Sequence, residues 1–136
     1  KAEPDEDGDA SHLLKFIVQG GVLLKSYKAL GRVRWHERFF RVSPRSAWLV
    51  WNKSEATVDD AKSSHLVLTA IHAVEAVNRS QVSGAPQGGF AFRVRSHQRT
   101  LDLLASSAEE RRRWIEALQY VIAHQREAKA ALWSQK

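Results

Sequence analysis

The stretch RTLDLLASSAEERRRWIEALQYVIAHQ, residues 99–125, decides the fold of this chain. Its first part alternates polar and apolar residues, which is the period of a β-strand with one buried face. Two serines follow, and each forms a possible capping box with the glutamate three residues later. The candidate pairs are Ser106 with Glu109 and Ser107 with Glu110. Apolar residues then recur at the spacing of one helical face, at Trp114, Ile115, Leu118, Val121 and Ile122. The pattern predicts a strand that leads directly into a long amphipathic helix.

Upstream of this stretch, short apolar or alternating runs are separated by turn residues. With the strand at 99–105 they predict about seven strands, spaced roughly every ten to fifteen residues, which favours an antiparallel barrel or an orthogonal sandwich. The upstream runs lie at 21–28, 36–43, 47–52, 65–77 and 89–96, and 65–77 holds one or two strands. The segment Ala29–Arg34, around Gly31, is predicted to be a loop between the first two strands.

The two ends of the chain are predicted to differ from this β-rich middle. Residues 1–10 are acidic and contain proline and glycine, so a disordered tail is expected there. A short helix is predicted over 11–19, capped by a serine and ended by two glycines. Residues 20–125 form the main domain, and 126–136 are predicted to extend its long helix.

Composition restricts the protein class. The chain has 136 residues, of which 43% are hydrophobic and 26% charged, as in one soluble globular domain. It contains no cysteine, which excludes disulfides and thiolate metal sites. No run of about 18 apolar residues is present, so no membrane-spanning segment is predicted. The sequence also lacks methionine, and we expect the natural start to lie upstream of residue 1.

Charge is distributed unevenly along the chain. Residues 1–9 carry five acidic side chains against Lys1, a net charge of −4, which leaves +10 on the remainder of a chain whose total is +6. A basic body of this kind indicates an anionic partner, such as a membrane surface, a nucleic acid or an acidic protein.

Several motifs, taken in order, resemble the pleckstrin-homology (PH) domain. Gly21–Lys25 resembles the family's G-x-L-x-K first strand, Trp35–Phe40 resembles its W-x-x-R-x-F second strand, and Trp114 stands where the family has its helix tryptophan. The resemblance covers about residues 20–125. It implies a fold that is mainly β with α: a seven-stranded antiparallel PH-type barrel or sandwich, capped by one C-terminal amphipathic helix, with a short N-terminal helix in addition.

Two narrower resemblances point to lipids. The T-L-D-L run followed by S-x-x-E and tryptophan is most similar to the PH domains of phosphoinositide-specific phospholipases C, although their catalytic barrel has no counterpart in this chain. The architecture also resembles, more weakly, the acylated PH-domain proteins of apicomplexan parasites, which sense phosphatidic acid.

A candidate headgroup site follows from the alternation of side chains along strands. Lys25 shares one strand face with Leu23, and Arg38 shares one with Phe40, so in a barrel both basic residues point into the open mouth. A phosphate could bridge them through charge-assisted hydrogen bonds. The resemblance implies a basic residue two before the arginine; in this chain it is His36, which is at most half-charged near neutrality and disfavours tight binding of a polyphosphorylated inositol.

The neighbouring loops add further basic and apolar residues to this candidate site. Leu30 and Val33 are predicted to insert into the membrane interface, flanked by basic residues. The predicted headgroup residues are Lys25, Lys28, Arg32, Arg34, His36, Arg38 and Lys53, with Arg95 and Arg99 as a secondary rim.

The expected function is a membrane-recruitment module that binds the phosphate headgroup of an anionic phospholipid, either phosphatidic acid or a phosphoinositide. We expect a monomer that is cytoplasmic and peripheral on the cytosolic face of a membrane, with an N-terminal lipid anchor upstream as a second attachment. No enzyme activity, metal or cofactor is predicted, since the histidines are scattered and no catalytic motif occurs. The alternative is a protein-interaction domain that does not bind lipid. Nucleic acid is disfavoured because no aromatic stacking platform accompanies the basic residues.

Overall fold

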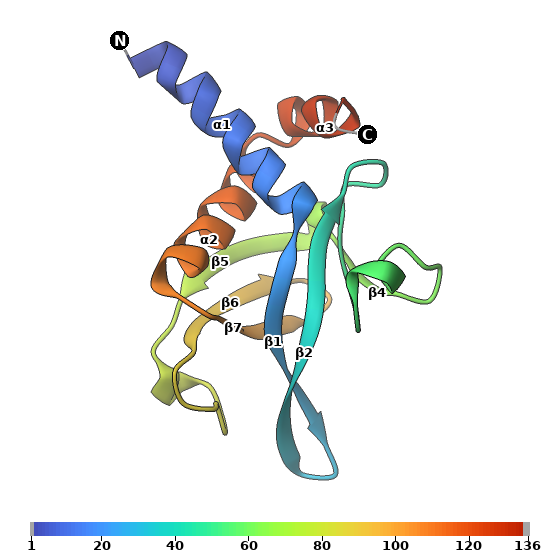
Figure 1. Cartoon of the computed structure of the whole chain (residues 1–136), viewed down its shortest axis with the longest axis vertical. Helices are drawn as coiled ribbons and strands as arrows, with labels where there is room; N and C mark the ends of the chain where they lie inside the picture. The colour runs from blue at the N-terminus through green and yellow to red at the C-terminus, as the bar shows by residue number, and fades with distance from the viewer. Residues whose placement is uncertain (1, 135–136) are drawn as a thin grey trace.

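The computed structural model of this chain describes residues 2–134, and its elements follow the order expected from the sequence (Figure 1). The predicted seven strands, the N-terminal helix and the C-terminal helix are confirmed. Three short 3₁₀ turns lie at Glu55–Thr57, Leu68–Ala70 and Arg79–Gln81. The main elements are α1 (Ala2–Gln19), β1 (Gly21–Ala29), β2 (Arg32–Ser43), β3 (Trp48–Asn52), β4 (Ser64–Val67), β5 (Ile71–Ala76), β6 (Phe90–Ser96), β7 (Thr100–Ala105), α2 (Ala108–Ala123) and α3 (Gln125–Trp133).

The seven strands form one antiparallel sheet in the order β4-β3-β2-β1-β7-β6-β5. Two pairs, Leu24 with Leu104 and Lys25 with Leu103, join β1 to β7 and so connect the two halves of the sheet. In Figure 1 the strands β5–β7 cross behind β1 and β2 at a steep angle. The inward side chains of both halves therefore share one core, in which Phe40, Trp51 and Phe92 are almost completely buried.

Helix α2 covers one end of this core. Its buried face carries Trp114, Leu118 and Val121, as the helical spacing predicts. Of the two possible capping pairs the structure has the second, because the Ser107 hydroxyl accepts a hydrogen bond from the Glu110 backbone N–H at 3.0 Å.

Helix α1 is longer than the sequence analysis predicts. The structure continues it back to Ala2, where a disordered tail over residues 1–10 and a helix over 11–19 were expected. Pro4 lies in the first turn, where its missing N–H removes no helical bond. Further along, Phe16 contacts the Trp114 ring edge-on with centroids 5.2 Å apart, which joins α1 to the core.

The chain after α2 also differs from expectation. The extension predicted over 126–136 is instead a separate helix, because His124 leaves the helical conformation at φ −126° and ψ 51°. Ala128 and Leu132 on α3 are buried in the main core, and α3 lies near α1 in Figure 1. A straight continuation of α2 would carry these apolar residues away from that core. Residues 135 and 136 lie outside the described part of the chain.

The predicted loop Ala29–Arg34 is an extension of the first two strands. Only Leu30 and Gly31 form the turn, both with positive φ (55° and 76°), as in the two-residue turns that match strand twist. The hairpin projects beyond the rest of the sheet, with Leu30 fully exposed at its tip (Figure 1). Three basic residues expected on a flexible loop therefore lie on a paired ribbon: Lys28, Arg32 and Arg34.

Among the helices at residues 2–134, none combines the length and the apolar character needed to cross a bilayer.

Candidate functional site

One face of the β1–β2 ribbon continues from the buried core to the exposed hairpin. Residues that pair across the ribbon point to the same side of the sheet. Leu23 on this face is buried, whereas the residues nearer the turn are increasingly exposed. The pairs on this face are Leu23 with Arg38, Lys25 with His36, and Tyr27 with Arg34.

Lys25 lies where this face leaves the core, and its residue is only 7% exposed. Its ammonium nitrogen lies 3.8 Å from the centroid of the Tyr27 ring and 5.9 Å from that of the Trp51 ring. It donates one hydrogen bond, at 3.1 Å, to the backbone carbonyl of Ser26. The two aromatic faces attract the cation without neutralising it.

The surroundings of Lys25 disfavour its charged form. Burial, followed by the positive charges of Arg99 and Arg38, lowers the pKa of Lys25 to about 8, and Asp102 opposes this only weakly. Asp102 is itself engaged by Arg93, with an Nε–Oδ1 distance of 2.6 Å. Among the side chains that the structure describes, those of residues 10–134, no carboxylate lies at ion-pair distance from the Lys25 ammonium.

Two guanidinium groups complete the cationic cluster. The Arg38 guanidinium carbon lies 5.4 Å from the Tyr27 ring centroid, and that of Arg99 lies 4.9 Å from the Trp51 ring centroid. Neither arginine forms an ion pair with any described side chain. Cations that converge without a counterion provide the donors and the charge that a phosphate group needs. We call this cluster the mouth: Lys25, Tyr27, Arg38, Trp51 and Arg99.

Several other predicted residues border the mouth. His36 lies edge-on to the tyrosine of the mouth, with ring centroids 5.4 Å apart. Lys53 is exposed, one residue beyond the last pair of β2 and β3, and continuing that register places it opposite Arg38. Arg32 and Arg34 continue the same face toward the turn and are exposed.

Three predicted residues lie elsewhere. Arg95 alternates with buried residues of β6 and forms an ion pair with Glu75 at 2.8 Å, so it lies on the outer side of the sheet and is neutralised. Lys28 and Val33 pair with each other on the ribbon face opposite to that of the mouth. Val33 is half-buried beside Gly84, so it does not share the exposed tip on which its membrane-insertion role was predicted.

The sequence did not predict Tyr27 and Trp51 as parts of the mouth, and it predicted Arg99 only as part of a secondary rim. The signal for Tyr27 was present, because it lies two residues after Lys25 and so shares its face. Trp51 could be placed only with the register of β3, in which it pairs with Phe40. Among the described residues, no group of three or more histidine, aspartate or glutamate side chains is arranged to hold a metal ion.

The comparisons with known proteins agree with this geometry. The family model described as PH domain matches residues 17–123. No curated protein matches the sequence significantly. Among similar solved structures, the N-terminal PH domain of human ARAP2 is 21% identical, with 78% of this chain and 79% of that chain covered and a TM-score of 0.58. The PH domain of human TBC1 domain family member 2 is 17% identical, with coverages of 79% and 82% and a TM-score of 0.62. The C-terminal PH domain of pleckstrin in complex with D-myo-Ins(1,2,3,4,5)P5 is 23% identical, with coverages of 77% and 97% and a TM-score of 0.56. At this level of identity the three likenesses establish a shared fold.

The narrower resemblances to phospholipases C and to the apicomplexan proteins stay predictions. The family model spans most of the chain, and the seven-stranded sheet closed by α2 is the architecture that the family motifs predicted. The chain belongs to the PH domain family.

Proposed function

We propose that the mouth binds the phosphate of an anionic phospholipid headgroup and thereby recruits the protein to the cytosolic face of a membrane. The observation that carries the proposal is a nearly buried lysine beside two arginines with no carboxylate partner in the described chain. PH domains commonly bind phosphoinositides and are generally non-catalytic modules. The similar pleckstrin domain, solved with an inositol pentakisphosphate, supports a phosphorylated ligand.

The energetics of the mouth support an anion as its ligand. A buried ammonium close to two other cations is unfavourable unless a counterion is present. A phosphate oxygen would accept hydrogen bonds from Lys25 and from both guanidinium groups, and its charge would restore the ordinary pKa of the lysine. Cations on an exposed surface gain less from such a ligand, because water already solvates them.

The number of positioned donors favours a headgroup with one exposed phosphate. Lys25, Arg38 and Arg99 surround one small region, and the neighbouring His36 ring lies against Tyr27. A phosphate monoester such as that of phosphatidic acid needs only a few donors. A polyphosphorylated inositol would also have to engage Arg32, Arg34 and Lys53 farther out. We therefore propose phosphatidic acid as the preferred lipid and a phosphoinositide as the alternative.

Two arginines, Arg99 in the β6–β7 turn and Arg95 in β6, provide a matched test of the mouth. Arg99→Gln should weaken sedimentation with phosphatidic acid vesicles about tenfold, because a hydrogen bond to a charged group contributes roughly 1.5–3 kcal/mol. Arg95→Gln removes the same charge from the outer side of the sheet and should change binding by less than about twofold. Equal losses in the two variants would show that only the overall charge of the protein matters. Equal sedimentation of the protein with neutral vesicles would favour a protein-interaction domain instead.

Calorimetry with soluble inositol trisphosphate distinguishes the two candidate lipids, because submicromolar binding would favour the phosphoinositide.

The exposed tip of the hairpin gives a separate prediction. Leu30→Asn should weaken binding to anionic vesicles by about tenfold, because full burial of a leucine contributes roughly 1.5–3 kcal/mol. Asparagine adopts the positive φ of this position readily, so the turn should be preserved. Binding of a soluble phosphate ligand should stay unchanged, and a parallel loss of that binding would show that Leu30 acts on the mouth and not through insertion.

A further inference from the structure

A second feature lies at the other end of the molecule, where α3 stands beside the turn between β2 and β3. Two hollows, of about 630 Å³ and about 460 Å³, meet there, and Arg126 and Lys129 of α3 border both of them. The larger hollow reaches Leu68, and the smaller one reaches Trp133. We call the two together the α3 cleft.

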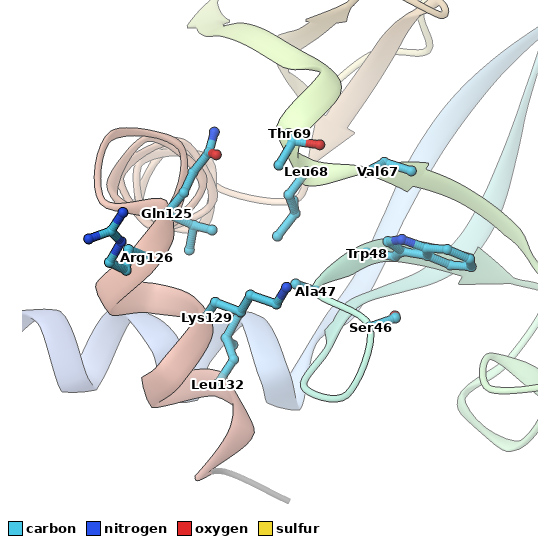
Figure 2. A pocket seen from close by; sticks show the side chains of 11 residues that line it. Ser46, Ala47, Trp48, Val67, Leu68, Thr69, Gln125, Arg126, Lys129 and Leu132 are labelled. Carbon is cyan, nitrogen blue, oxygen red and sulfur yellow. The ribbon is translucent and has the colours of Figure 1, made fainter.

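The larger hollow has an apolar floor and a few polar groups at its edge. Figure 2 shows Leu68 extending from the 3₁₀ turn toward the side on which α3 carries Leu132. Both leucines are buried, as is Val121 of α2, which also lines this hollow. Gln125 extends toward Thr69 at the upper edge (Figure 2). Mostly apolar surfaces with few convergent polar groups are typical of ligand sites.

The described side chains at the cleft carry only positive charge. Arg45, Arg126 and Lys129 border it, and each is exposed. Among the side chains described at residues 10–134, no acidic one lines either hollow, and none forms an ion pair with these three cations. The Lys129 side chain runs across the hollow toward Ala47, as Figure 2 shows. The cleft therefore complements a ligand that is both acidic and apolar.

We propose that the α3 cleft binds an acidic peptide segment of a partner protein, in which apolar side chains flank one or more carboxylates. The inference depends on Arg126 and Lys129, which border both hollows. An extended peptide that crosses these two residues would place a carboxylate between the two hollows. Each hollow would then receive one apolar side chain. The two tryptophans and two arginines at the cleft belong to the residue types that dominate the binding energy of protein interfaces.

The position of the cleft favours a protein over a membrane as its partner. Helix α3 lies at the end of the molecule opposite to the β1–β2 turn (Figure 1). If the proposed function is right, that turn faces the bilayer, and the α3 cleft faces away from it and remains accessible. The charge and shape of the cleft do not depend on lipid binding at the mouth, so the peptide proposal and the lipid proposal can fail separately.

The test uses the full chain labelled with ¹⁵N and an acetylated, amidated heptapeptide with leucine and phenylalanine at its ends and three glutamates at its centre. At millimolar peptide, the amide signals of Ser46, Thr69, Gln125 and Lys129 should shift. The double variant Arg126→Glu with Lys129→Glu should bind the peptide about tenfold or more weakly, because the reversed charges at the α3 cleft repel the glutamates of the peptide. Lys15→Glu with Lys62→Glu changes net charge equally at exposed positions outside both hollows and should leave binding within about twofold.

Four outcomes would decide against the proposal. No shift at the cleft, equal binding of the counterpart peptide with three lysines, or shifts confined to the amides of Lys25 and Arg38 would each overturn it. Shifts at the cleft caused by phosphatidic acid vesicles in place of the peptide would assign the cleft to a membrane and overturn it as well. A loss of vesicle binding in the Arg99→Gln variant with unchanged peptide binding would support both sites independently.

Discussion

Replacing Lys25 by methionine is expected to stabilise the free protein while abolishing its binding to anionic vesicles. Folding lowers the pKa of this lysine from 10.5 to about 8, so the charged form is disfavoured in the folded state. That shift corresponds to about 3 kcal/mol as an upper estimate at neutral pH. Methionine has a similar length and packs well against aromatic rings such as that of Tyr27. We expect a gain of roughly 1–3 kcal/mol, or about 3–10 °C in Tm.

The pH dependence of this gain identifies its cause. Below pH 8 the lysine is charged in both states, and the full destabilisation is present. Between pH 8 and 10.5 the unfolded state binds more protons than the folded state, so the stability of the wild-type protein rises relative to the variant. Above pH 10.5 the difference should vanish. Thermal melts of both proteins from pH 6 to 10.5 measure it, and Lys62→Met in an exposed loop is the matched control.

A less stable Lys25→Met protein at pH 7 would contradict this account. It would show that the attraction of the ammonium to the Tyr27 ring outweighs the cost of its burial. The expected combination of higher stability and lost binding is typical of binding residues, which proteins retain at a cost in stability.

The parts of the site that the sequence predicted are those set by local alternation. Lys25 and Arg38 share a face because side chains alternate along a strand and because β1 and β2 are adjacent in sequence. Arg99 could not be ranked in this way, because it reaches the mouth only when the β6–β7 turn comes close to β4. Its guanidinium lies 3.5 Å from the backbone carbonyl of His65, 34 residues away. Contacts of this kind depend on closure of the whole sheet.

Two errors in the predicted fold have different physical causes. The turn between β1 and β2 has leucine where the usual two-residue hairpins have asparagine or aspartate before glycine. The sequence therefore predicted a longer loop at this position. The break at His124 has no proline or glycine to mark it, and it follows from the burial of Ala128 and Leu132 in the core. Core packing thus accounts for the break at His124, whereas the exposed two-residue turn follows from the pairing of Ala29 with Arg32 in the β1–β2 ribbon.

Binding of vesicles that carry a phosphate monoester headgroup is expected to weaken by about tenfold for each pH unit above about 8. The mouth needs the charged form of Lys25, and the protonated fraction of a group falls about tenfold per unit above its pKa, which for this lysine is about 8. Titration of the lipid acts in the opposite direction but is nearly complete at pH 8, because the second pKa of a phosphate monoester lies near 6. Sedimentation of the protein with phosphatidic acid vesicles from pH 7 to 9.5 measures the effect.

The Lys25→Arg variant separates titration of this residue from all other effects of pH. A guanidinium keeps its proton throughout this range, so binding of the variant should be nearly independent of pH, even if it is weaker overall. Calorimetry of the wild-type protein at pH 9 should also detect the uptake of about one proton on binding, because the phosphate raises the pKa of the lysine that it contacts. A wild-type profile that stays flat to pH 9.5 would mean that the lysine titrates normally or that the phosphate binds elsewhere. A slope shared equally by the Lys25→Arg variant would place the titrating group outside the mouth.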